Sequence, residues 1–159
     1  MIEQLEVYLN RACQGDCEAA YYAAHILKQM GESDELIQVQ LKRAAIAGYA
    51  IASRELAELA FSGRLTPAGY IVNNDKNCLA QGKRWLELAA SQNDVSSMIL
   101  LAVCFDKGML GLNKDHESAK NYHSMAEEYI RTHDMFHDIM SVVLWDTIAK
   151  DYAENYSRK

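Results

Sequence analysis

The stretch KRWLELAA at residues 83–90 decides the fold, because weaker copies of it lie on both sides. Its apolar residues recur three and four positions apart, which predicts one face of an amphipathic helix. A large aromatic residue, Trp85, comes four positions before a pair of alanines. Small residues let two helices approach closely, and a bulky residue fills the gap between successive helix pairs.

Two other segments carry the same spacing. Tyr122, 37 residues after Trp85, and Gln40, 45 residues before it, each precede an alanine by four positions. The helix before each of the last two copies also repeats, since LAELAFSG at 56–63 shares its leucine, alanine and final glycine with LAVCFDKG at 101–108. A period of tens of residues indicates stacked helix pairs, none of which buries its apolar face alone.

Apolar periodicity and glycine breaks predict an all-α chain with about eight helices and almost no strand signal. Asp16 and Ser33 are expected to cap two of the helices at their N-termini. One long connection, residues 64–74, contains the only proline of the chain. The predicted helices span residues 2–13, 17–30, 34–47, 49–62, 75–91, 95–107, 115–131 and 134–156.

The pattern resembles the Sel-one-like repeat (SLR) family, which is related to the tetratricopeptide repeat. The resemblance covers about residues 16–130, with Gln40 in place of the usual tryptophan in the first copy and Gly82 in place of an alanine in the second. It implies a right-handed α/α superhelix and a single domain over residues 1–159. This domain would comprise an N-terminal helix (1–15), three helix-pair repeats (16–48, 49–93 and 94–131) and a capping helix (134–156).

Composition excludes several functions. The formal net charge of −6 argues against nucleic acid as a partner, because binding to a phosphate backbone needs clustered Lys and Arg. No stretch approaches the roughly 18 apolar residues of a membrane span. The first residues have no signal-peptide pattern, which predicts a cytoplasmic protein, or a periplasmic one if a leader has been removed. The four cysteines form no CxxC pair and are expected to pack as small apolar residues.

Candidate catalytic and metal-binding residues are few. His133 and His137 lie four positions apart and could bind a metal. Cys13 and Cys17 are also four apart and could bind a metal or form a redox pair. Trp85 is interpreted as a packing residue by its place in the repeat. No nucleophile–base arrangement, phosphate-binding loop or carboxylate pair is recognisable, so we expect neither an enzyme nor a cofactor.

Two surfaces are predicted to bind a protein partner. One is the concave face that the first helix of each pair would line, where paired aromatic residues suit recognition of a peptide or helix. An alternative for its two tyrosines is packing against the first helix of the chain. The predicted residues of this face are Tyr21, Tyr22, His25, Arg54, Glu55, Glu58 and Ile99.

The second surface is the helix at 134–156, which is apolar around most of its circumference. Phe136, Trp145 and Tyr152 are its predicted contact residues, either for a partner protein or for a second copy in a homodimer.

These observations predict a non-enzymatic protein-interaction module, and the resemblance implies an adaptor or scaffold. Two alternatives remain at this point. One is a bacterial immunity protein that neutralises a cognate toxin or other effector, and the other is a metal- or redox-dependent regulator.

Overall fold

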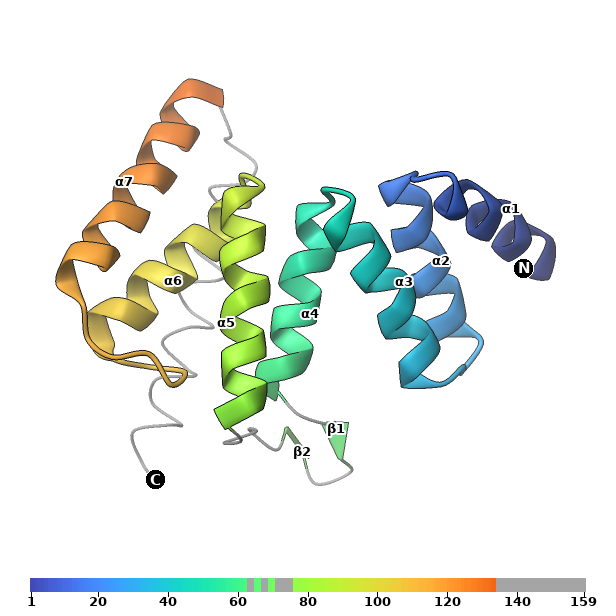
Figure 1. The fold of residues 1–159 in the computed structure, drawn as a ribbon, viewed down its shortest axis with the longest axis horizontal. Helices are drawn as coiled ribbons and strands as arrows, with labels where there is room; N and C mark the ends of the chain where they lie inside the picture. The colour runs from blue at the N-terminus through green and yellow to red at the C-terminus, as the bar shows by residue number, and fades with distance from the viewer. Residues whose placement is uncertain (63–64, 67–68, 71–75, 134–159) are drawn as a thin grey trace.

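The computed structural model describes residues 1–62, 65–66, 69–70 and 76–133. Within these ranges the chain forms seven helices and one short hairpin (Figure 1). In chain order the elements are α1 (Ile2–Cys13), α2 (Cys17–Gln29), α3 (Asp34–Ile46), α4 (Ala50–Ser62), β1 (Leu65–Thr66), β2 (Gly69–Tyr70), α5 (Lys76–Ser91), α6 (Val95–Lys107) and α7 (His116–His133).

Each helix packs on the next one along the chain, and the most extensive contacts join α2 to α3, α4 to α5 and α6 to α7. The helices follow one another in a row, with α1 at one end and α7 at the other (Figure 1). This arrangement confirms the predicted all-α superhelix of stacked helix pairs. No helix in the described part of the chain is both long enough and apolar enough to cross a bilayer.

The helix ends follow from local sequence. Asp16 and Ser33 cap α2 and α3 as predicted, each accepting a hydrogen bond from the backbone amide three residues later. Gly108 ends α6 in the left-handed conformation, with φ of 67°. Most predicted helix bounds lie within one or two residues of those observed.

One type of turn closes α1, α3 and α5. In each, the residue three positions after a buried alanine has a positive φ, and the next amide donates a hydrogen bond to the carbonyl five residues earlier. This geometry is the Schellman motif. It explains why α1 and α3 both end in alanine–x–x–glycine and why α5 ends in the same spacing with Asn93 in place of the glycine. The three pairs are Ala12 with Gly15, Ala45 with Gly48 and Ala90 with Asn93.

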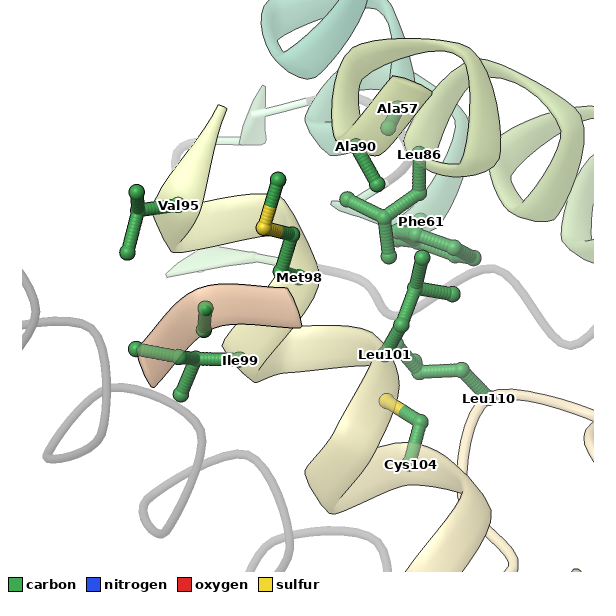
Figure 2. Close-up of a cluster of buried hydrophobic side chains, with 11 residues drawn as sticks. Ala57, Phe61, Leu86, Ala90, Val95, Met98, Ile99, Leu101, Cys104 and Leu110 are labelled. Atoms are coloured by element: carbon green, nitrogen blue, oxygen red, sulfur yellow. The ribbon is translucent and has the colours of Figure 1, made fainter. Parts of the chain in front are cut away.

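Trp85 joins the two larger parts of the core. It is half-buried and packs against the cluster around Leu41 and Leu56 as well as the cluster around Leu86 and Leu101. In the second cluster, Phe61 from α4 meets Leu86 and Leu101 (Figure 2). Trp85 therefore fills the gap between helix pairs, as the repeat pattern predicts.

The connection at 64–74 differs from the expectation of a plain loop. Leu65 pairs with Tyr70 and Thr66 with Gly69 in a two-residue antiparallel ladder. A pair of strands this short has no alternating apolar pattern, so sequence periodicity could not reveal it. The predicted helix at 134–156 lies outside the described residues.

Candidate functional site

The face shared by α2 and α4 contains most of the predicted partner-binding residues. Ala20, Ala23 and Ala24 turn one side of α2 into the core, where each is at most 1 % exposed. Tyr21, Tyr22 and His25 therefore lie on the remaining sides of the helix, where they are half-buried or exposed. We use the name α2–α4 face for Tyr21, Tyr22, His25, Arg54, Glu55 and Glu58.

Four tyrosine rings form a continuous row across this face. The ring of Tyr22 lies 5.6 Å from the ring of Tyr8 on α1 and 6.0 Å from that of Tyr21. The Tyr21 ring lies 4.8 Å from the ring of Tyr49, the residue just before α4. These separations are typical of favourable tilted and edge-to-face aromatic pairs. Tyr22 thus contacts α1, as the packing alternative predicts, yet it remains 43 % exposed. It can therefore contact α1 and a partner at once.

Glu55 connects α4 to α2. The Tyr21 hydroxyl donates a hydrogen bond of 2.7 Å to Glu55 Oε1, and His25 Nε2 lies 3.4 Å from the same oxygen. The Tyr21 ring also meets the His25 ring edge-on at 4.5 Å. The pKa of Tyr21 is raised above its usual range, first by burial and then by its hydrogen bond to Glu55. Tyr21 therefore stays protonated and keeps Glu55 in place.

Arg54 connects α4 to α6. Its guanidinium donates to Asp94 over 3.2 Å, and the two side chains are only 21 % and 11 % exposed. Asp94 also caps α6 by accepting from the amide of Ser97. Gln92, in the turn before α6, accepts a hydrogen bond from the Ser53 hydroxyl and donates one to the backbone carbonyl of Ala45. These contacts fix the spacing of the helix pairs beside the α2–α4 face.

Glu58 is a carboxylate in a poorly hydrated position. Its pKa is raised to about 7, mainly by burial and also by the nearby charges of Glu55 and Asp94, although Arg54 and Lys28 act in the opposite direction. Near neutral pH this side chain is therefore only partly ionised. A partner that brought a positive charge to it would favour the ionised form.

The structure contradicts one predicted contact residue. Ile99 is only 9 % exposed and belongs to the core cluster of α6, so it does not line an open face. The first helix of the last pair is more apolar than those before it, and helical spacing alone did not show which of its sides faces outward. The α2–α4 face therefore ends at Asp94 rather than extending along α6.

Several residues beside this face were not predicted from the sequence. Tyr8, Tyr49, Gln92 and Asp94 all contribute contacts there. Tyr49 and Asp94 both follow a positive-φ turn residue, Gly48 or Asn93. That turn places the residue after it at the junction of two helix pairs. Recognising the turn in the sequence would therefore have identified Tyr49 and Asp94 as residues beside the face.

The other predicted sites are only partly described. Phe136, Trp145, Tyr152 and His137 lie outside the described residues, whereas His133 stacks on Tyr129 with ring centroids 3.9 Å apart. Within the ranges that the structure describes, no three His, Cys, Asp or Glu side chains are placed to share a metal ion.

The cysteines differ from the expectation of uniform packing. Cys104 is buried, and burial raises its pKa to about 12. Cys13 is exposed at the last residue of α1, whereas the preceding residue, Ala12, is buried. Cys17 and Cys78 are half-buried.

Comparison with known proteins identifies a solved structure with a similar fold. No protein-family model and no curated protein matches the chain. Among solved structures, a Sel1 repeat protein from Oxalobacter formigenes superimposes with a TM-score of 0.62 and 25 % sequence identity, over 78 % of this chain and 88 % of that one. The helix pairs, the repeated turns and this similarity agree: the chain has a Sel1-like (Sel-one-like) repeat fold.

Proposed function

We propose that the chain is a non-enzymatic adaptor that binds a segment of another protein on its α2–α4 face. Sel1-like repeat folds generally mediate protein–protein interaction. The observation that carries the proposal is the row of four tyrosine rings, within which the side chain of Tyr22 is exposed.

The packing of this row favours recognition. Aromatic side chains dominate interface energetics when they offer a large area and lose little conformational freedom on binding. Tyr21 is held by Glu55 and by three ring contacts, so its position is set before a partner arrives. A preorganised surface of this kind binds more tightly than a mobile one of equal area.

A displayed library of random 12-residue peptides, selected against the full chain, tests this proposal. Peptides enriched on the wild-type protein should lose about tenfold or more in affinity for a Tyr22→Ala variant. Val39→Ala is the matched control, because Val39 is 50 % exposed on α3, a helix that carries none of the four tyrosines. Peptides that bind both variants equally well would place the binding surface elsewhere. A library without any binder would contradict the interaction function itself.

A further inference from the structure

The α2–α4 face carries more negative than positive charge. Glu18 and Glu55 both act electrostatically on Tyr49, and Glu55 and Asp94 act on Glu58. The bases that act on Glu58 are Arg54 and Lys28, and Arg54 is already paired with Asp94. After that pair is set aside, the carboxylates of Glu18 and Glu55 and the partly ionised Glu58 face Lys28 and the His25 ring, whose Nε2 lies 3.4 Å from Glu55 Oε1.

The carboxylates lie beside the tyrosine rings. Glu55 accepts a hydrogen bond from the Tyr21 hydroxyl, and the centre of the Tyr22 ring lies 6.0 Å from that of the Tyr21 ring. The face of an aromatic ring attracts a cation, and a neighbouring carboxylate adds a direct charge interaction. Together these groups form a surface that is complementary to a cationic side chain.

Other occupants fit less well. A phosphate or carboxylate on the partner would meet like charges at Glu55 and Glu58, which is destabilising across an interface. A wholly apolar segment would remove these carboxylates from water without offering them a partner. A cationic side chain would offer these carboxylates an opposite charge in place of the water that they lose.

We propose that the α2–α4 face binds a lysine or arginine side chain of the partner protein, against the ring of Tyr22 and with its charge directed to Glu55. This inference rests on the function proposed above and specifies the chemistry of the partner. The partner segment is therefore basic, in keeping with the net charge of −6 on this chain.

The peptide library provides the probe. Peptides enriched on the wild-type chain should be rich in Lys and Arg, and replacement of their basic residues by norleucine should lower affinity about tenfold. Glu55→Gln should lower the affinity of the original peptides by a similar factor, while an acceptor oxygen for the Tyr21 hydroxyl remains. Glu87→Gln is the control, since it removes one negative charge on α5, where Glu87 pairs only with Lys83 among the described residues.

The outcomes separate the two proposals. Binders that need Tyr22 but are neutral or acidic, and that bind Glu55→Gln as well as the wild type, would overturn the cation inference and leave the interaction function standing. Equal losses in Glu55→Gln and Glu87→Gln would also overturn it, because the effect would then be one of overall charge. A library without binders would overturn the interaction function and the inference together.

Discussion

Gly82 in the middle of α5 provides a sharp test of the packing between α4 and α5. Alanine is favoured over glycine inside a helix by about 1 kcal/mol, so helix propensity alone predicts that Gly82→Ala stabilises the protein. A Cβ atom built at Gly82, however, would lie 2.5 Å from Cε1 and 2.7 Å from Cζ of Phe61. Phe61 is 5 % exposed and packed within a core cluster, so its ring cannot move away without disturbing its neighbours.

The two effects oppose each other, and packing should dominate. Adding a methyl group to a filled core costs about 1–3 kcal/mol. We therefore expect Gly82→Ala to lower the free energy of unfolding by about 1 kcal/mol, after the gain in helix propensity is subtracted. In a Phe61→Leu background the space beside Gly82 opens, and the same change should raise the free energy of unfolding by up to about 1 kcal/mol.

Urea denaturation followed by circular dichroism measures both effects, and the double-mutant cycle should show a coupling of about 2 kcal/mol between the two positions. Ala80→Gly on the exposed side of α5 calibrates the propensity difference in the same helix. If Gly82→Ala stabilises the wild-type protein as much as Ala80→Gly destabilises it, the close contact with Phe61 is wrong.

Three further predictions concern single positions. Gln40 is 8 % exposed, and its Oε1 atom has no hydrogen-bond partner among the described residues. Gln40→Met should therefore raise the free energy of unfolding, measured by urea titration, by about 1 kcal/mol. A lower free energy of unfolding would mean that Oε1 accepts a hydrogen bond in the folded protein. Asn93 has a φ of 67°, so Asn93→Ala should lower the free energy of unfolding by about 1 kcal/mol, whereas Asn93→Gly should not lower it. If both variants are destabilised equally, the side chain of Asn93 matters and its backbone conformation does not. Because the pKa of Glu58 is raised to about 7 in the folded protein from an ordinary 4.5, the folded state binds more protons in this interval, and stability should fall as pH rises through it. Glu58→Gln should remove up to about 3 kcal/mol of that fall between pH 5 and 8, and an unchanged pH profile would contradict the raised pKa.

Sequence alone predicts the parts of this fold that repeat. Ala45 and Ala90 are buried because each copy requires a small side chain where two helices approach, and that requirement is visible in the spacing. Asp16 caps α2 by accepting a hydrogen bond from the backbone amide three residues later. This interaction is local, so the sequence reveals it directly. Interactions within one helix or turn are therefore predictable.

Interactions between distant residues were not predictable in the same way. The sequence places Tyr21 and Glu55 in corresponding helices, but their hydrogen bond depends on the angle between two helix pairs. Ile99 occupies a position that sequence analysis grouped with the α2–α4 face, and the packing of α6 buries it. Helical periodicity identifies an apolar side, but it cannot decide which polar or mixed positions remain open when a helix has neighbours on several sides.

The repeat explains why a binding face can differ so much from one helix pair to the next. The fold depends on a few small buried positions, such as Ala52 in α4 and Ser97 in α6, both of which are fully buried. The neighbouring positions are free of this constraint, so α2 carries aromatic residues there and α4 carries charged ones. Asp94 contributes to both functions, since it caps α6 and holds Arg54. The position of the α2–α4 face is therefore fixed by the same contacts that hold the helix pairs together.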